Sequence, residues 1–249
     1  GAGASDAAAT PAGSAAPAGS VAGAGVDSGC WAWLASSVGA CAGVCCGTAS
    51  AAGRFFLKKL NMVKHCIRII AGRYRRTPIA VPDLPGLRPT PDRVRETLYN
   101  WLTHLWEGQF EDKRVLDLFA GTGALGFEAA SRGAGHVQMV ERDRTAVSAL
   151  RALRDKLDAQ AVRIHAGDAL QALERMDASR YDLVLLDPPF GQGWLDRLWP
   201  RLPAVLAPAG LVYAESEAPL QPPAGYEIVR QDRAGAVHYG LLQFAALRN

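Results

Sequence analysis

Positive charge is missing from the first 53 residues of this 249-residue chain, where Asp6 and Asp27 are the only charged side chains. A secretory signal peptide starts with a basic segment, so this stretch argues against one. The uncharged run from Ser28 to Gly53 is long enough to cross a bilayer, but its five glycines and single leucine disfavour a membrane helix. We expect a cytoplasmic protein that does not bind membranes.

Cysteine is scarce beyond the same stretch. Only Cys66 follows the first methionine, Met62, so the rest of the chain lacks the thiols for a disulfide framework. Cys41 and Cys45 have a spacing that could bind zinc, but no second pair of cysteines or histidines follows at the distance of a zinc finger, so we expect no metal site. The remaining four cysteines are Cys30, Cys41, Cys45 and Cys46.

Composition divides the chain into three predicted parts. Residues 1–61 are rich in alanine and glycine, which indicates a disordered leader or a start assigned too far upstream, and we expect natural translation to begin at Met62. Residues 62–110 are predicted to form an arm and a helix, and residues 111–249 a core domain. The whole chain has 49% hydrophobic residues and 27 basic against 24 acidic side chains, which excludes wholesale disorder.

Hydrophobic periodicity predicts an α/β fold. Two apolar runs, Ile67–Gly72 and Ile79–Pro82, flank a basic turn and predict a β arm. A helix is expected from about Pro91 to Trp106, with Thr90 as its cap. Further on, strand-like runs alternate with helical periods such as residues 146–157, which is typical of a parallel sheet covered by helices. The predicted strands are Val115–Phe119, Val137–Glu141, Val162–His165, Tyr181–Leu186 and Leu211–Glu215, followed by an antiparallel hairpin of Tyr226–Arg230 and Val237–Leu247.

A glycine-rich turn, Gly121–Gly126, follows the first of these strands and leads into a helix. Glycines let a ligand approach the backbone closely, and Glu141, at the end of the next strand, can bind both ribose hydroxyls of a nucleoside cofactor. NAD, FAD and S-adenosylmethionine all suit this arrangement. Asp117 favours S-adenosylmethionine, because a carboxylate attracts its cationic amino end and repels a pyrophosphate. Asp168 can accept a hydrogen bond from adenine or cap the next helix.

The motif Asp187-Pro188-Pro189-Phe190 follows the strand Tyr181–Leu186, whose end opens into the ligand crevice of such sheets. The exocyclic amine of a nucleobase is a poor nucleophile, and two acceptors, Asp187 and the Pro188 carbonyl, can hold its N–H groups in an attacking geometry. Two prolines stiffen the loop, and Phe190 can stack on an extruded base. The motif predicts in-line methyl transfer without a covalent enzyme intermediate; the structural alternative is a stiff loop with a core phenylalanine.

Basic side chains gather at one end of the domain. This run is either a phosphate-binding arm for nucleic acid, with Tyr74 available for stacking, or a solvated basic hairpin. Its members are Lys64, Arg68, Arg73, Arg75 and Arg76, followed by Arg88, Arg93 and Arg95.

Together these motifs resemble the bacterial 16S ribosomal RNA guanine-N2 methyltransferases of the small-subunit methyltransferase D type. The resemblance runs from about Ile67 to Leu247, although the Ala/Gly leader departs from the family. The segments that carry it are Ile67–Gly72, Gly86–Leu98, Asp117–Gly126 and Asp187–Phe190.

The resemblance implies a Rossmann-like class I methyltransferase with a seven-stranded, mostly parallel sheet whose last strand is antiparallel. It implies methylation of a guanine N2 amine of 16S rRNA within an assembling small subunit, and we expect the protein to be a monomer. An adenine-N6 DNA methyltransferase is the alternative, a dehydrogenase ranks third, and a non-catalytic RNA-binding module would explain the basic arm alone. The implied residues are Asp187, Pro188, Pro189 and Phe190 for catalysis, and Asp117, Phe119, Ala120, Gly121, Thr122, Gly123, Glu141, Asp168 and Ala169 for S-adenosyl-L-methionine. The segment with Arg88 and Arg93 matches the family's RNA entrance, and the basic run adds Arg73, Arg75 and Arg76 as expected RNA contacts.

Overall fold

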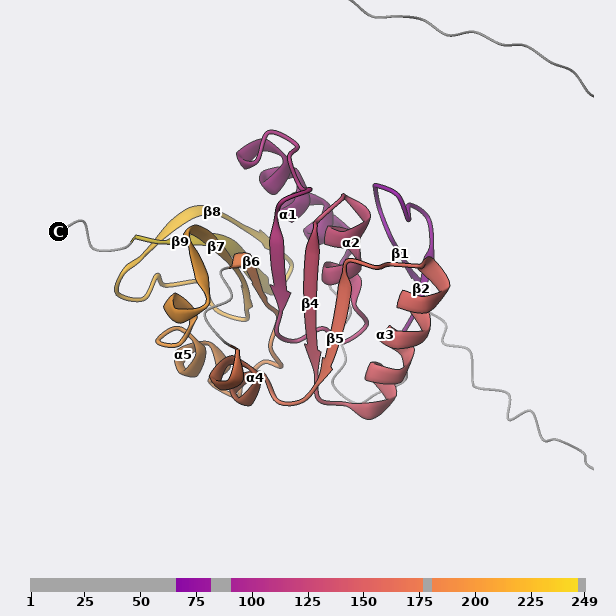
Figure 1. The fold of residues 1–249 in the computed structure, drawn as a ribbon. Coiled ribbons are helices and arrows are strands. Elements are labelled where there is room, and N and C mark those ends of the chain that lie inside the picture. Colours follow the sequence, from indigo (N-terminus) through magenta and orange to yellow (C-terminus); the bar gives the residue numbers. More distant parts are fainter. Residues whose placement is uncertain (1–65, 82–90, 177–180, 246–249) are drawn as a thin grey trace, which may run out of the picture. The chain divides into compact units, whose positions relative to one another are not determined.

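The structure, a computed structural model, describes residues 66–81, 91–176 and 181–245 (Figure 1). All of them belong to one unit of the chain, residues 57–249. The leader predicted for residues 1–61 lies outside the described residues, as do the predicted cap Thr90 and the predicted RNA contact Arg88. The three-part division of the chain stays a prediction.

A seven-stranded sheet forms the centre of the described residues, with the strand order β5-β4-β3-β6-β7-β9-β8. Every neighbouring pair from β5 to β7 is parallel, and β9 is antiparallel to both of its neighbours. The predicted mostly parallel sheet with an antiparallel last strand is therefore confirmed. The strands are β3 (Arg114–Asp117), β4 (His136–Glu141), β5 (Val162–Ala166), β6 (Tyr181–Leu186), β7 (Leu206–Ser216), β8 (Tyr226–Ala234) and β9 (Val237–Phe244).

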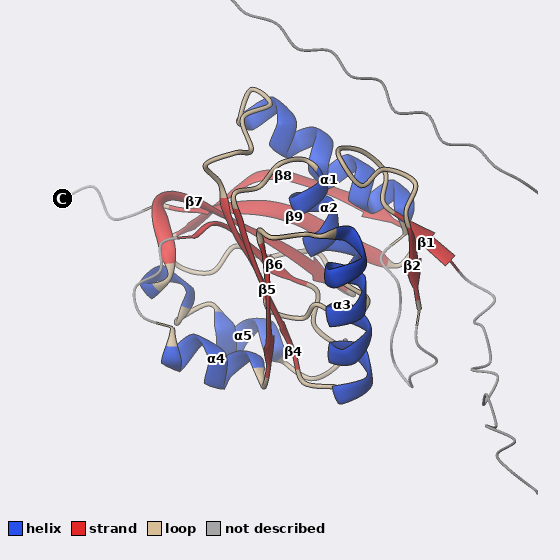
Figure 2. Ribbon diagram, turned by 45° about the vertical axis from the view of Figure 1, so that its right-hand side comes forward, coloured by secondary structure: helices blue, strands red, loops and turns tan. Residues whose placement is uncertain are grey.

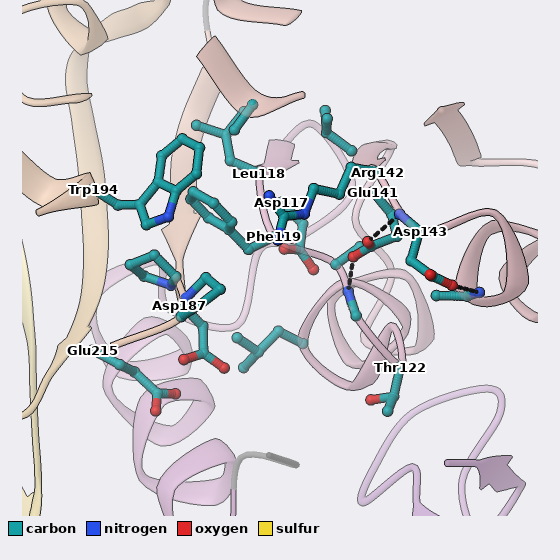
Figure 3. Close-up of a pocket in the computed structure, with 18 of the residues that line it drawn as sticks. Asp117, Leu118, Phe119, Thr122, Glu141, Arg142, Asp143, Asp187, Trp194 and Glu215 are labelled. Atoms are coloured by element: carbon teal, nitrogen blue, oxygen red, sulfur yellow. Dashed lines mark hydrogen bonds between the residues drawn. The ribbon is translucent and has the colours of Figure 1, made fainter. Parts of the chain in front are cut away.

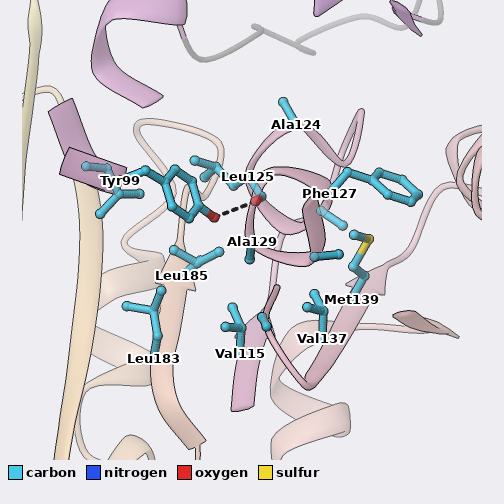
Figure 4. Close-up of a cluster of buried hydrophobic side chains, with 14 of the residues drawn as sticks. Tyr99, Val115, Ala124, Leu125, Phe127, Ala129, Val137, Met139, Leu183 and Leu185 are labelled. Carbon is cyan, nitrogen blue, oxygen red and sulfur yellow. Dashed lines mark hydrogen bonds between the residues drawn. The ribbon is translucent and has the colours of Figure 1, made fainter. Parts of the chain in front are cut away.

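Helices cover both faces of this sheet (Figures 1 and 2). Side chains of α1, α2 and α3 pack on one face, and those of α4 and α5 pack on the other. Successive strand residues point to opposite faces: Val115 belongs to the first core, part of which Figure 4 shows, and Leu116 belongs to the second. The helices are α1 (Asp92–Leu105), α2 (Ala124–Ser131), α3 (Arg144–Leu157), α4 (Ala169–Arg175) and α5 (Trp194–Leu198), with a 3-10 turn at Leu202–Ala204.

Helix α1 confirms the predicted helix but begins one residue later than expected. Pro91 is its N-cap and not its first helical residue, and no side chain caps it. The helix is held by its buried stripe instead: the Tyr99 hydroxyl donates a 2.6 Å hydrogen bond to the Leu125 carbonyl of α2 (Figure 4). This contact joins α1 to the helix that follows the glycine-rich turn.

Strand β7 starts earlier than predicted, at Leu206 instead of Leu211. Tyr181 of β6 pairs with Leu206, whereas Leu183 pairs with Leu211, so the pairing is irregular between them. The intervening segment contains Pro208 and Gly210, which sequence patterns assign to turns. At the other end of the sheet, β9 stops at Phe244, and the predicted end at Leu247 lies outside the described residues.

The predicted β arm is also confirmed. Strands β1 (Cys66–Arg68) and β2 (Pro78–Ala80) pair antiparallel, and residues 66–81 are called the arm below. Buried Glu128 of α2 accepts hydrogen bonds from the backbone N–H groups of Ile70 (2.7 Å) and Ala71 (3.0 Å). The Ser131 hydroxyl accepts another from the N–H of Tyr74 (2.9 Å). The arm is thus fixed to α2 through its backbone.

Gly72 lies at the closest approach of the arm to α2. Its φ is +81°, and a Cβ there would overlap the Ser131 carbonyl. We expect Gly72→Ala to detach the arm from α2, because overpacking costs about 1–3 kcal/mol. Trypsin should then cut after Arg73, Arg75 or Arg76 much faster than in the unchanged protein.

Gly108→Ala is the matched control for this experiment. Gly108 has a φ of +78°, but a Cβ there meets nothing within 4 Å, so it introduces the same backbone strain without the overlap. Equal cleavage rates for the two variants would contradict the proposed attachment of the arm.

Candidate active site

A pocket of about 680 Å³ opens at the carboxyl ends of β3, β4, β6 and β7 (Figure 3). This volume lies within the usual range for sites of small molecules and cofactors. The carboxyl edge of a parallel sheet is where open α/β folds bind their ligands. Its lining includes Asp117, Phe119, Ala120, Gly121, Thr122, Glu141, Asp168, Ala169, Asp187, Pro188, Pro189 and Phe190, which the sequence singled out.

Gly123 is the predicted cofactor residue that does not line this pocket. It is the N-cap of α2, with a φ of +80°, and a Cβ there would meet the side chains of Leu150 and Phe127. Its N–H donates to the Ala120 carbonyl at 2.6 Å, which closes the tight turn. Gly123 therefore shapes the turn and the packing of α2.

Glu141 has a fixed orientation at the end of β4. Its Oε2 accepts a hydrogen bond from the N–H of Gly121 at 2.8 Å, and its Oε1 accepts one from the N–H of Asp143 at 2.8 Å (Figure 3). An ionised carboxylate has about four acceptor positions, so these bonds orient the group and leave it able to bind ribose hydroxyls. Glu141 also fixes the glycine-rich turn by holding Gly121.

Asp117 is almost fully buried, at 1% exposure, beneath the glycine-rich turn. Its Oδ2 has no hydrogen-bond partner among the described residues. Burial, followed by the charge of Asp187, raises the pKa of this carboxyl to about 7, against the lowering effect of the Phe119 N–H. A bound cation would favour the ionised form, so the position suits the ammonium group of an amino acid.

Asp168 caps α4, which is one of its two predicted roles. One of its oxygens accepts hydrogen bonds from the N–H groups of Leu170 (3.0 Å) and Gln171 (3.3 Å). Both Asp168 and Ala169 line the pocket as well. The cap therefore holds the carboxylate in place at the edge of the site.

Sequence reasoning missed several residues of this pocket. Trp194 packs its indole against the ring of Phe119, with ring centroids 5.3 Å apart, and donates a 3.0 Å hydrogen bond to Gln192. Buried Glu215 lines the pocket beside Asp187 (Figure 3). The position of Glu215 at the end of a predicted strand could have indicated that it lines the pocket. No sequence pattern indicated that Trp194 does so.

The predicted RNA contacts lie in two places. Arg73, Arg75 and Arg76 are exposed in the turn of the arm, and Arg93 is exposed on α1. Arg95, which the sequence grouped with them, is buried at 0% exposure. It donates hydrogen bonds to Asp92 (2.5 Å) and to the Arg68 carbonyl (3.0 Å), so it is a structural residue and not part of the basic surface.

Comparison with known proteins identifies the family. The family model described as Conserved hypothetical protein 95 matches residues 67–243. The ribosomal RNA small subunit methyltransferase D of Escherichia coli (strain K12) is 40% identical over 182 residues, which cover 71% of this chain and 89% of that protein. The chain belongs to the ribosomal RNA small subunit methyltransferase D family. The methyltransferase D of Haemophilus influenzae is 35% identical over 184 residues, 71% of this chain and 93% of that protein.

Solved structures agree with this assignment to the methyltransferase D family. A putative methyltransferase from Escherichia coli has 39% identity and a TM-score of 0.65, with 73% of this chain and 99% of that chain covered. A putative methylase from Haemophilus influenzae has 32% identity and a TM-score of 0.61, with 73% and 100% covered. The predicted methyltransferase fold is confirmed.

S-adenosyl-L-methionine is the predicted methyl donor of this methyltransferase. The described residues fit it, because the buried Oδ2 of Asp117 offers an acceptor for a cation and Glu141 offers an oriented carboxylate for ribose. Among these residues no group of three or more His, Cys, Asp or Glu side chains could hold a metal ion. None of the helices in the described ranges has the length and apolar character to span a membrane.

Proposed function

We propose that this methyltransferase transfers a methyl group from S-adenosyl-L-methionine to the exocyclic N2 amine of a guanine in 16S rRNA, as a monomer acting on an assembling small subunit. The observation that carries the proposal is the position of Asp187–Phe190 in the same pocket as Asp117 and Glu141. The relatives named as small-subunit rRNA methyltransferases support rRNA as the polymer.

The residues of the pocket divide the work between cofactor and base. Asp117 binds the amino end of the methionine moiety, Glu141 the ribose, and Asp168 with Ala169 the region of the adenine. Phe119 to Thr122 form the wall of the cofactor site, with Gly123 supporting the turn. Bound S-adenosyl-L-methionine supplies an electrophilic methyl group on a sulfonium.

Asp187 and the Pro188 carbonyl accept the N–H groups of the target amine, and Phe190 stacks on the base. A carboxylate of ordinary pKa near 4 is too weak to deprotonate a neutral aryl amine beforehand. Asp187 therefore positions the nitrogen for in-line attack, in which the new N–C bond forms as the S–C bond breaks. The product nitrogen is cationic and acidic, and it loses its proton to Asp187 or water, with S-adenosylhomocysteine as the second product.

The exposed cations of the arm and α1 bind the RNA backbone in this proposal. We expect Arg73→Ala combined with Arg75→Ala to raise the apparent RNA KM and to flatten its dependence on salt. For a single strand, each phosphate that the protein no longer neutralises reduces the slope of log K against log salt by about 0.7. The measurement is RNA KM at several KCl concentrations.

Arg175→Ala combined with Arg201→Ala is the control for the arm. Both side chains are exposed. Arg175 is the last residue of α4 and Arg201 follows α5, and these two helices cover the opposite face of the sheet from the arm. The control should keep the original salt slope, and an unchanged slope in the arm variant would argue for a solvated hairpin that does not bind RNA.

One assay tests the base and the polymer together. The full chain is incubated with methyl-labelled S-adenosyl-L-methionine and, in parallel, with unmodified 16S rRNA, small-subunit particles and duplex DNA. Digestion and mass spectrometry then identify the labelled nucleoside. We expect N2-methylguanosine, most of it from the particles. N6-methyladenine from DNA would overturn the proposal in favour of the alternative enzyme, and bound cofactor without any transfer would favour a non-catalytic RNA-binding module.

A further inference from the structure

Glu215 and Asp187 occupy equivalent positions on neighbouring parallel strands. Leu186, the last residue of β6, pairs with Ala214 of β7. The next residue along the chain is Asp187 after Leu186 and Glu215 after Ala214. Neighbouring strands lie about 4.8 Å apart, and residues at the same level project to the same face of the sheet. Figure 3 shows both carboxylates pointing into the same part of the pocket, which both residues line.

Glu215 is buried and has a fixed orientation. It is 3% exposed, and its Oε1 accepts a 2.9 Å hydrogen bond from the hydroxyl of Tyr213, which is itself fully buried. Burying a carboxylate costs free energy unless hydrogen bonds compensate. The proposed transfer mechanism uses Asp187 and gives Glu215 and Tyr213 no part, so this buried pair needs another explanation.

We propose that Glu215 selects guanine by accepting the N1–H of the target base. This inference rests on the proposed function, in which Asp187 holds the N2 amine. Guanine carries the N1–H donor directly beside that amine, so two adjacent carboxylates match two adjacent donor groups. Glu215 is then a specificity-determining residue, and Tyr213 positions its carboxylate through the hydrogen bond to Oε1.

The same geometry excludes bases that have an amine beside an acceptor. Adenine and 2-aminopurine carry a lone pair at N1 in place of the N1–H. Either base would bring that lone pair against the buried carboxylate of Glu215, with no donor between them. A site built to bind an N–H group rejects the analogue that lacks it by factors as large as about 10⁴.

The base 2-aminopurine is the most direct probe, because it keeps the reactive N2 amine and lacks only the N1–H and the oxygen of guanine. The methylated guanine is first mapped in 16S rRNA, and a synthetic segment with 2-aminopurine at that position is ligated into the RNA. We expect the unchanged protein to prefer guanine by at least about 10²-fold in kcat/KM. Glu215→Gln should lower this preference below about 10-fold, because an amide can accept from N1–H or donate to the N1 lone pair.

Controls separate this role from a structural one. Glu217→Gln changes an exposed carboxyl of the same pocket and should keep the preference. Tyr213→Phe removes the bond that orients Glu215 and should lower the preference less than Glu215→Gln does. S-adenosyl-L-methionine affinity is measured for each variant and should stay within about twofold of the original, since this inference gives Glu215 no contact with the cofactor.

Each result has a distinct meaning. Weak preference for guanine in the unchanged protein would overturn the inference without any variant. Equal losses on guanine and 2-aminopurine in Glu215→Gln would also overturn it, because a structural role affects both bases alike. If Glu215→Gln does not fold, the preference of Tyr213→Phe decides. Absence of N2-methylguanosine from the unmodified RNA would instead contradict the proposed function itself.

Discussion

Asp187→Ala should lower the rate of methyl transfer by about 10²–10³-fold while S-adenosyl-L-methionine still binds. Asp187 is proposed to hold the target amine in its attacking geometry, and Asp117 and Glu141 are proposed to bind the cofactor. The variant should therefore have a lower kcat when RNA and cofactor are both saturating. Single-turnover transfer of labelled methyl groups measures it without interference from product release.

Asp196→Ala serves as the control for this substitution. Asp196 is an exposed residue of α5 and does not line the pocket, so this variant makes the same aspartate-to-alanine change outside the site. This variant should transfer methyl groups at the original rate. A rate for Asp187→Ala within about threefold of the control would rule out Asp187 as the residue that positions the amine.

Cofactor affinity should rise with pH up to about 7 and then level off. The pKa of Asp117 is raised to about 7, so the carboxyl of the free protein is mostly protonated below this pH. In the proposed site the cationic amino end of the cofactor binds the ionised form, so binding below pH 7 must first release that proton. Between pH 8 and pH 5.5 the affinity should fall by about 30-fold, as measured by isothermal titration calorimetry.

Two variants test the origin of this pH dependence. Asp117→Asn removes the titrating group, so its weaker affinity should not change between pH 5.5 and pH 8. Asp187→Asn removes a negative charge that raises the pKa of Asp117, so the rise in affinity should move to lower pH. An unchanged pH profile in Asp117→Asn would show that another group controls binding.

The fold was predictable because the sheet is apolar on both faces. Runs such as Leu183–Leu186 of β6 are continuously hydrophobic, and the glycine-rich turn and Asp187 mark the ends of two such strands. Strand ends that are distant in the sequence meet at one edge of the sheet, so the cofactor loop and the Asp187 motif were expected in one pocket. These local patterns do not depend on exact strand register.

The neighbours of Asp187 were not predictable in the same way. The place of Glu215 depends on the pairing of Leu186 with Ala214, and that register follows an irregular stretch after Leu206. Arg95 was counted as surface charge, but it lies four residues before buried Tyr99 on the inner face of α1. The four-residue spacing between Arg95 and Tyr99 indicates that both lie on the same face of the helix, but Arg95 was grouped with the neighbouring basic residues instead.

Helix α2 is only eight residues long, yet it begins at the cofactor turn and carries Glu128 and Ser131, which hold the arm. An α-helix rises about 1.5 Å per residue, so its two ends lie about 12 Å apart. The arginines of the arm therefore stand at a set separation from the glycine-rich turn. In the proposed function, an RNA is methylated efficiently only if its folded form places a phosphate in the arm while an extruded guanine reaches the pocket, so the rigidity of one short helix becomes a criterion for substrate choice.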